Sequence, residues 1–544
     1  MYPTISKLLD DTVVKHGDRV ALRMPIPKER KHGRGIQLVL NEITYARLGE
    51  MTGRFAMALS ELGVSAGDRV ALISKPRAAW ATSFFAILRC GAAVVPLDPE
   101  LQQGEIERIL REAEVKGIVS SGSKTEDVLA FHSDLPGNPF VVSMDRVQDE
   151  EALFLDALLL GKTELPRTDV DPSSLAILMY TSGTTGNAKG AMLTHANITS
   201  NALTAVKLVA LAADDNFLSI VPWNHIYGLT ITLVTPMIVG ATTTYTPVDR
   251  NLAQVMKAAH PTIILGVPKL YNVLYGRVMS SIRKSGIKRA IYRSSPSLMG
   301  KLVKKKLFGK QFRFFTSGGA PLSPEASAGF RGMGLGIMEG YGLTETSPLL
   351  AMCEAFDEQP GMAAVSEIEL KIKDRDEDGV GEVLAKGPNI MAGYYKNPAA
   401  TAEVIDSDGW FHTGDLGTYV NGRLVLSGRA KNVIVLDTGK NVYPEEIEWE
   451  FVTIPSIEEI MVHEGTRQGV PTVSAQVYPN WPALKEMGIE SPELALDHIW
   501  EAIKERSENL AVFKRIKYKE SITLVDEPFE KSAKLDIKRH LHQQ

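Results

Sequence analysis

A run of eleven residues, Tyr180 to Gly190, combines residue types that suit phosphate chemistry. Seven of the eleven are Gly, Ser or Thr, and one is a lysine. Such a loop exposes backbone N–H groups and hydroxyls to a polyphosphate, and the lysine adds a point charge. The spacing is not that of a Walker A loop, and a plain surface loop is the competing interpretation. Because the run follows the apolar, strand-like segment LAILM, we predict a phosphate site made by Thr181, Ser182, Gly183, Thr184, Thr185, Gly186 and Lys189.

A second segment, EGYGLTET, begins at Glu339 and places an aromatic ring, a hydroxyl and a carboxylate close together in the chain. Tyr341 can stack on a nucleobase, and the hydroxyl of Thr344 can reach a phosphate. Glu345 supplies a hard oxygen ligand, and Mg²⁺ typically takes one or two protein carboxylates together with substrate phosphates. A glycine-rich turn with a solvated glutamate is the alternative. We predict that the segment, including Glu339, binds a nucleotide and that Glu345 binds its magnesium ion.

Four further segments follow in order along the chain: NHIYG (224–228), SGGAPL (317–322), GWFHTGDLG (409–417) with GRAKNVIVL (428–436), and EKSAKLDIKR (530–539). Together with the two segments above, they resemble the ordered motifs of the acyl-adenylate-forming superfamily. This superfamily includes acyl-CoA synthetases, adenylation domains of peptide synthetases, and luciferases. The resemblance covers nearly the whole chain, and the form AKNVIVLDTGKNVYPEEIE looks most like fatty acyl-CoA synthetases.

The resemblance implies roles for residues that would mean little alone. Gly319, Ala320 and Pro321 would line the adenine and the acyl entrance. Asp415 resembles the family carboxylate that accepts hydrogen bonds from both ribose hydroxyls, and Arg429 resembles the residue that also holds the ribose. Without the resemblance, either of these two charged residues could equally be half of a surface ion pair.

Three more roles also rest on the resemblance. His225 would position the acyl carboxylate where it meets the thiol channel, and Gly439 would let a pantetheine arm pass close to the backbone. Three lysines, Lys531, Lys534 and Lys538, compete for the role of neutralising charge as the carboxylate attacks the α-phosphate. Family tails have a proline, five residues and then the lysine, and this spacing selects Lys534.

The length, composition and charge of the whole chain limit these hypotheses. Its 544 residues favour at least two domains, and 44% hydrophobic with 23% charged residues is typical of a soluble globular protein. A net charge of −5 does not indicate a nucleic-acid partner, and two cysteines far apart argue against a disulfide framework. We find neither a signal peptide nor a transmembrane segment, so we expect a cytoplasmic protein.

Alternating apolar runs and amphipathic patterns indicate an α/β fold built from repeated βαβ units. We predict a large N-terminal domain (1–428), with two parallel-sheet α/β subdomains and a small β-barrel-like region. The β region is indicated by EIELKIKDRDEDGVGEVLAKG, which alternates around a turn. A small, mobile α+β domain (429–544) is expected to follow it.

These observations predict an AMP-forming acyl-CoA ligase, an acid–thiol ligase that uses ATP, Mg²⁺ and coenzyme A. The acid is expected to be a medium- or long-chain fatty acid, bound by apolar segments around Ile226–Pro236, Val267–Pro268 and Gly336–Met338. An aryl acid, a carrier-protein acceptor and a catalytically silent relative that only binds ligands are the alternatives. The oligomeric state is left open.

Overall fold

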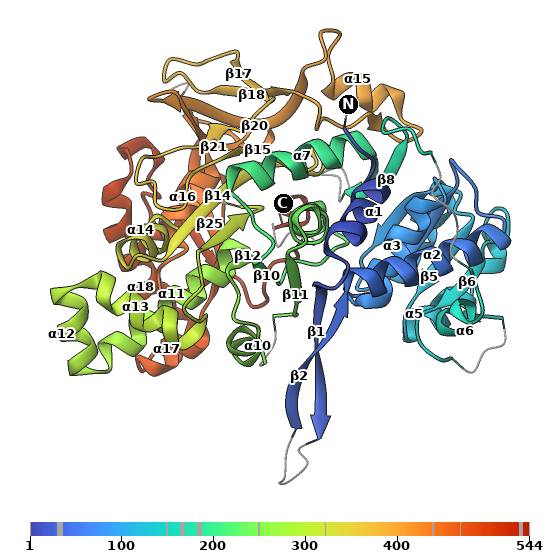
Figure 1. Ribbon diagram of the computed structural model, residues 1–544. Helices are drawn as coiled ribbons and strands as arrows, with labels where there is room; N and C mark the ends of the chain where they lie inside the picture. Colours follow the sequence, from blue (N-terminus) through green and yellow to red (C-terminus); the bar gives the residue numbers. More distant parts are fainter. Residues whose placement is uncertain are drawn as a thin grey trace.

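The computed structural model describes residues 2–29, 36–147, 151–163, 169–181, 188–248, 251–320, 322–437, 440–467, 469–531 and 537–542. Two large mixed sheets, a smaller antiparallel sheet and a C-terminal α+β part make up the molecule (Figure 1). Among these residues, no helix is long and apolar enough to cross a membrane.

The first large sheet has eight strands in the order β19-β9-β8-β4-β3-β5-β6-β7. Strands β3 to β8 pair in parallel, whereas β8, β9 and β19 pair in antiparallel fashion. Its core strands are apolar along their length because helices cover both faces. The bounds are β3 Arg69–Ile73, β4 Ala93–Leu97, β5 Gly117–Ser120, β6 Phe140–Ser143, β7 Leu153–Phe154, β8 Leu175–Thr181, β9 Lys189–Thr194 and β19 Gly393–Tyr394, with α1 Ile5–His16, α2 Tyr45–Glu61, α3 Ala78–Arg89, α4 Gln103–Ala113, α5 Ser123–Leu129 and α6 Leu155–Leu159.

The second large sheet has nine strands in the order β16-β15-β14-β13-β12-β10-β11-β1-β2. Its central strands are parallel, as the βαβ pattern predicts. The bounds are β1 Val20–Glu29, β2 Ile36–Thr44, β10 Asn216–Ser219, β11 Thr242–Tyr245, β12 Ile263–Gly266, β13 Phe314–Gly318, β14 Gly336–Gly342, β15 Leu349–Met352 and β16 Ala363–Ala364, with α7 His195–Leu208, α8 Ile226–Gly228, the π-helical η2 Leu229–Val234, α9 Thr235–Val239, α10 Leu252–Ala259, α11 Pro268–Arg283, α12 Gly286–Ser294, α13 Pro296–Leu307 and α14 Pro324–Gly332.

The predicted small β region is a four-stranded antiparallel sheet in the order β17-β18-β20-β21. The expected hairpin is confirmed, because Glu369 to Lys373 pair with Glu382 to Lys386. Among the described residues no pairing joins β17 to β21, so this sheet is open and does not close into a barrel. The bounds are β17 Glu369–Lys373, β18 Gly381–Lys386, β20 Phe411–Val420 and β21 Arg423–Arg429, with α15 Pro398–Val404.

The C-terminal part packs its helices on a three-stranded sheet, with a separate core of its own. Its core side chains include Ile447, Phe451 and Ile499, all fully buried. The bounds are β22 Ile434–Val435, β23 Asn441–Val442, α16 Pro444–Phe451, β24 Ile457–Arg467, β25 Val470–Pro479, α17 Trp481–Glu486, α18 Pro492–Arg506 and β26 Ile522–Leu524.

A buried carboxylate aligns the starting ends of three parallel strands. Asp215, directly before β10, forms an ion pair with Arg313, directly before β13, at 2.5 Å between Nη1 and Oδ2. Its other oxygen accepts from the hydroxyl of Thr262, directly before β12, at 2.7 Å. Because Asp215 is almost fully buried, removing it would leave two donors without their partner.

We therefore expect Asp215→Ala to lower the free energy of unfolding by about 2 to 4 kcal/mol, below the full cost of a buried pair because Arg313 is partly exposed. Urea unfolding followed by tryptophan fluorescence measures it. The matched control is Asp214→Ala, since the neighbouring Asp214 is exposed although it pairs with Arg19. Equal midpoints for the two variants would contradict this role for Asp215.

Candidate active site

A cleft of about 3210 Å³ lies beyond the carboxyl ends of the parallel strands β10, β12, β13 and β14. Ligands of open α/β sheets bind at such ends because the chain turns there without side chains filling the space. Every described residue that was predicted to act in catalysis or in cofactor binding lines this cleft, from segments more than two hundred residues apart. They are Thr181, Lys189, His225, Gly319, Ala320, Glu339, Tyr341, Thr344, Glu345, Asp415 and Arg429.

A tyrosine connects the predicted metal ligand with the predicted phosphate lysine. The hydroxyl of Tyr394 donates to Glu345 Oε1 at 2.9 Å, and the ammonium of Lys189 lies 5.1 Å from the centre of the Tyr394 ring. Strand β19 positions Tyr394 by pairing with β9, which begins at Lys189. Burial, reinforced by the charge of Glu345, raises the pKa of Tyr394 far above its ordinary value, so the phenol remains a donor.

The phosphate segment is the connection of a β-hairpin. Thr181 and Lys189 are register partners at the ends of β8 and β9. The hydroxyl of Thr181 donates to the carbonyl of Lys189 at 3.4 Å. Both residues line the cleft, so the chain enters and leaves the predicted loop at its wall. The predicted phosphate ligands Ser182, Gly183, Thr184, Thr185 and Gly186 lie outside the described residues.

A second polar group joins the nine-stranded sheet to the four-stranded sheet. The hydroxyl of Tyr341, in β14, donates to Asp415 Oδ2 at 2.8 Å. The other carboxylate oxygen of Asp415 lies 2.7 Å from Nε of Arg429, its register partner on β21. Burial, then the charge of Asp415, raises the pKa of Tyr341, which keeps its proton. A carboxylate oxygen has two acceptor sites, so each oxygen of Asp415 can accept more than one hydrogen bond.

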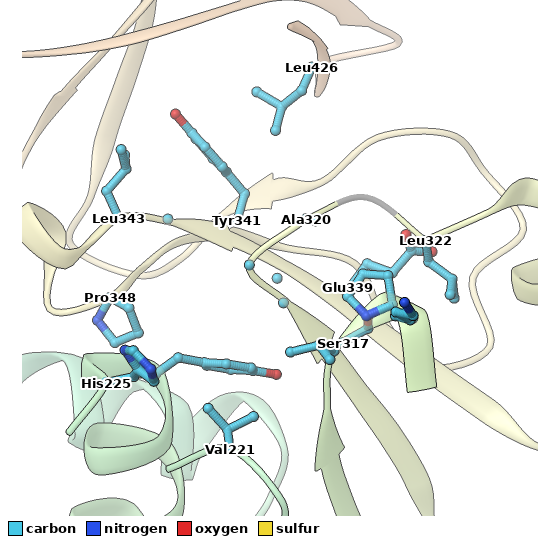
Figure 2. A pocket seen from close by; sticks show the side chains of 18 of the residues that line it. Val221, His225, Ser317, Ala320, Leu322, Glu339, Tyr341, Leu343, Pro348 and Leu426 are labelled. Carbon is cyan, nitrogen blue, oxygen red and sulfur yellow. The ribbon is translucent and has the colours of Figure 1, made fainter. Parts of the chain in front are cut away.

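Glu339 lies deeper in the same wall, where Figure 2 shows it beside Leu322. Its Oε1 accepts from the hydroxyl of Ser327 at 2.8 Å, and it pairs with Arg331 at 3.3 Å. Both partners belong to α14, so the carboxylate fixes this helix against β14. The contacts therefore assign Glu339 a structural task in addition to any role as a nucleotide contact.

The glycines of this region serve two different purposes. Gly319 has a φ of +91° and open space around its Cβ position, which suits a backbone that a ligand approaches. Gly342 instead makes room for the protein itself, since a Cβ there would lie 1.6 Å from the carbonyl oxygen of Pro348. The close approach at Gly342 is therefore between two parts of the chain itself.

His225 precedes the short helix α8 and lines the cleft next to Pro348 (Figure 2). Its backbone carbonyl accepts from Leu229 N at 2.9 Å, which continues the chain into the π-helical η2. Nearby, the hydroxyl of Tyr227 lies 3.3 Å from the hydroxyl of Thr316. The histidine thus lies in the cleft wall directly before this helical segment.

Apolar residues, most of which lie in or against one hydrophobic cluster, line a further part of the cleft. Side chains from α7, β10, η2 and β12 to β15 contribute to it, namely Ala205, Phe217, Ile231, Ile263, Phe314, Met338 and Met352. Val267 and Pro268, expected from the sequence, also line the cleft, whereas Gly336 and Ile337 do not. The cleft therefore combines a charged part with a largely apolar part.

Three remaining predicted residues, Pro321, Gly439 and Lys534, lie outside the described residues. The chain on either side of Lys534 is described, and Lys531 and Ile537 form a β-bridge there and line the cleft. Lys531 is itself ion-paired with the almost fully buried carboxylate of Glu459. Of the three competing lysines, Lys531 is therefore committed to a structural pair.

Sequence reasoning missed Tyr394. The segment GYYKN in which it lies carries two adjacent tyrosines and no charge pattern typical of a site. Only the pairing of β19 with β9 brings Tyr394 next to Lys189 and Glu345. A strand of two residues leaves too short a pattern to predict this pairing.

Comparison with known proteins agrees with this arrangement. Residues 9–395 match the family described as AMP-binding enzyme, and residues 431–544 match the AMP-binding enzyme C-terminal domain. A long-chain-fatty-acid–CoA ligase of Mycobacterium tuberculosis is 30% identical over 84% of this chain and 82% of its own. The peroxisomal long chain acyl-CoA synthetase 6 of Arabidopsis thaliana is 28% identical, over 83% and 71%. A feruloyl-CoA synthase of an Amycolatopsis species is 29% identical, over 77% and 80%.

Solved structures share the fold over the whole chain. ATP-bound MatB from Rhodopseudomonas palustris has a TM-score of 0.78 at 25% identity and covers 100% of this chain and 98% of its own. The adenylation domain of a Mycobacterium chelonae carboxylate reductase has a TM-score of 0.83 at 22% identity, covering 99% and 89%. With the family match over most of its length, this chain belongs to the AMP-binding enzymes, the acyl-adenylate-forming family that its motifs resemble.

Proposed function

We propose that this protein is an ATP-dependent, AMP-forming acyl-CoA ligase for medium- or long-chain fatty acids, with residues 1–428 as its adenylation domain and 429–544 as its C-terminal lid. The observation that carries the proposal is a cleft whose lining combines the residues of a polar, nucleotide-type site with a group of apolar side chains. Relatives named as long-chain fatty acid ligases support the substrate class.

In the first half-reaction, a fatty acid carboxylate oxygen attacks the α-phosphate of ATP, and the bond to pyrophosphate breaks. Lys189 and the hairpin loop after Thr181 bind the departing phosphates. Asp415 and Arg429 hold the ribose, and Tyr341 contributes to the wall beside the base. The hydroxyl of Thr344 donates a hydrogen bond to the α-phosphate, and Lys534 neutralises charge that develops there. Positioning and electrostatics supply the rate in such a transfer.

Glu345 fits a magnesium ion. Its carboxylate lines the cleft and accepts from Tyr394, a neutral hydroxyl that leaves the negative charge in place. Bound there, Mg²⁺ would neutralise phosphate charge. Tyr394 orients the carboxylate by its hydrogen bond.

In the second half-reaction, the sulfur of coenzyme A attacks the acyl carbonyl carbon, and AMP leaves. His225 lines the cleft, which suits a residue that positions the acyl carboxyl group. Gly439 would allow the pantetheine arm to pass close to the backbone. An aryl acid is the second candidate substrate, favoured by the feruloyl-CoA synthase relative.

Pyrophosphate release tests the proposal across fatty and aryl acids, with and without coenzyme A. We expect sustained release that requires the thiol and a fatty acid of medium or long chain. A preference for aryl acids would contradict the proposed fatty acid substrate. Pyrophosphate release that is independent of coenzyme A would contradict the proposed acyl acceptor.

The role of Lys534 can be separated between the two half-reactions. We expect Lys534→Ala to slow adenylate formation by about a hundredfold or more because one preorganised charge is lost, with Lys534→Arg partly active. Thiolation of synthetic acyl-AMP should stay within about threefold because that step does not need the lysine. Equal losses in both half-reactions, measured by rapid quench, would refute the assignment.

The metal role of Glu345 predicts a shifted magnesium requirement. Glu345→Gln keeps the acceptor for Tyr394 but loses the charge, so about tenfold more Mg²⁺ should be needed for half-maximal activity. The matched control is Glu354→Gln, an exposed glutamate in the neighbouring segment that does not line the cleft. An unchanged magnesium titration of Glu345→Gln would exclude the role.

The apolar space predicts how chain length is selected. Ile231→Phe adds volume to a residue that lines the cleft, so kcat/KM for long acids should fall more than about tenfold while short acids stay within about threefold. Val206→Phe is the control, since Val206 packs against the same cluster but does not line the cleft. A uniform loss for all chain lengths would show that this space does not hold the acyl chain.

A further inference from the structure

Positive charge is concentrated in one stretch of this weakly acidic protein. The 75 residues from Arg250 to Pro324 contain fifteen Lys or Arg and no Asp or Glu. In a chain of net charge −5, these fifteen positive charges leave −20 for the rest. Charge is therefore distributed very unevenly along the chain, and the small net charge of the whole protein does not reveal this.

Eleven of these basic residues fall between Arg277 and Lys310, a segment that we call the basic face. It comprises the last part of α11 together with α12 and α13, which project from one side of the molecule at the left of Figure 1. Most of the eleven side chains are exposed. Among the described residues, the ion pairs of this region start from Lys269 and Arg313, which flank the basic face, and none starts within it.

Part of the basic face is shaped into a shallow pocket of about 460 Å³. Three cations, Arg277, Lys284 and Lys288, and three hydroxyls, Ser280, Ser281 and Ser285, make up its wall. The ammonium of Lys288 already reaches across to the hydroxyl of Ser281 at 2.7 Å. The pocket is thus lined by positively charged side chains and hydroxyl groups, and such groups bind a phosphate.

Apolar side chains stand among the cations. Ile287 is 77% exposed, and Leu298 and Leu302 are about half exposed, so α12 and α13 each present large apolar groups to solvent. A nucleic-acid backbone or an acidic protein surface would neutralise the cations but would gain little from these three side chains. A lipid surface accommodates both, because basic groups meet the headgroups while apolar groups enter the acyl boundary.

The position of the basic face next to the cleft also favours a lipid surface as its partner. Ser280 lines both the shallow pocket and the large cleft, and Met279, Gly276 and Val273 continue the cleft wall along α11. One helix therefore borders the cleft on one side and carries the start of the basic face on the other. A fatty acid dissolved in a bilayer would meet the protein close to a wall of its cleft.

We propose that the basic face docks the protein on the surface of an anionic lipid bilayer, with a lipid phosphate in the pocket of Arg277, Lys284 and Lys288. The docking itself is independent of the proposed function. Only its use, the delivery of membrane-dissolved acid to the cleft, rests on the fatty acid substrate.

Vesicle flotation with the full chain tests the docking. We expect binding to vesicles of phosphatidylcholine with phosphatidylglycerol, little binding to phosphatidylcholine alone, and loss of binding at high salt. Removing three charges with Lys284→Gln, Lys288→Gln and Arg289→Gln should lower the partition coefficient by about a hundredfold, at about fivefold per basic residue. None of these three residues lines the large cleft.

The matched control removes three exposed lysines from elsewhere, with Lys15→Gln, Lys116→Gln and Lys207→Gln, and should bind within about twofold of the original chain. A second variant, Ile287→Ser with Leu298→Ser and Leu302→Ser, should weaken binding while the salt dependence is kept. Equal binding of the basic-face variant and its control would overturn the proposal. So would binding to both vesicle types alike, or sedimentation of the free protein as a salt-sensitive dimer without vesicle binding.

Delivery is measured separately. With a short, dissolved acid the basic-face variant should turn over like the control, whereas with long-chain acid supplied in anionic vesicles it should be slower by about tenfold or more. If the protein binds vesicles but the two variants turn over long-chain acid equally, the docking is supported and the delivery of acid from the membrane is contradicted. Failure of every acid as substrate would remove the proposed function and leave the vesicle result intact.

Discussion

The buried carboxylate of Asp415 is the constraint on which the arrangement of the sheets depends. A charge that is almost fully removed from water must be compensated, and here Tyr341 and Arg429 do so from two different strands. Tyr341 belongs to the nine-stranded sheet, whereas Asp415 and Arg429 belong to the four-stranded sheet. The carboxylate therefore links the two sheets at the wall of the cleft, which Tyr341, Asp415 and Arg429 all line.

Arg429 is also the last residue of β21, directly before the chain turns into the C-terminal part. The residue that forms the ion pair with Asp415 is therefore also the residue after which the C-terminal part of the chain begins. The C-terminal part in turn approaches the cleft through the residues around Lys531, which is paired with Glu459. Residues of the C-terminal part, whose hydrophobic core is separate, thus complete one wall of the cleft.

Much of this could be predicted from the sequence because local patterns decide it. Apolar runs such as RVALI and AVVPL predict buried parallel strands, and glycine and hydroxyl residues after such runs predict the ends at which ligands bind. The motif residues that the structure describes accordingly meet in one cleft. The pairing of β19 with β9 could not be predicted, since two residues carry no periodicity, and Tyr394 was missed with it. Gly342 is needed because the carbonyl group of Pro348, directly before β15, approaches it closely. Only the folded chain reveals this contact.

The walls of the cleft come from residues between Pro96 and Leu541, so segments spread over most of the chain take part. Contacts between such distant residues form only after the loops between them have closed, and this makes them late events in folding. A nascent chain still lacking its final residues has both large sheets but only part of the cleft wall. Enzymatic activity regained during refolding would therefore report the last assembly step, whereas circular dichroism would report the earlier sheets and helices.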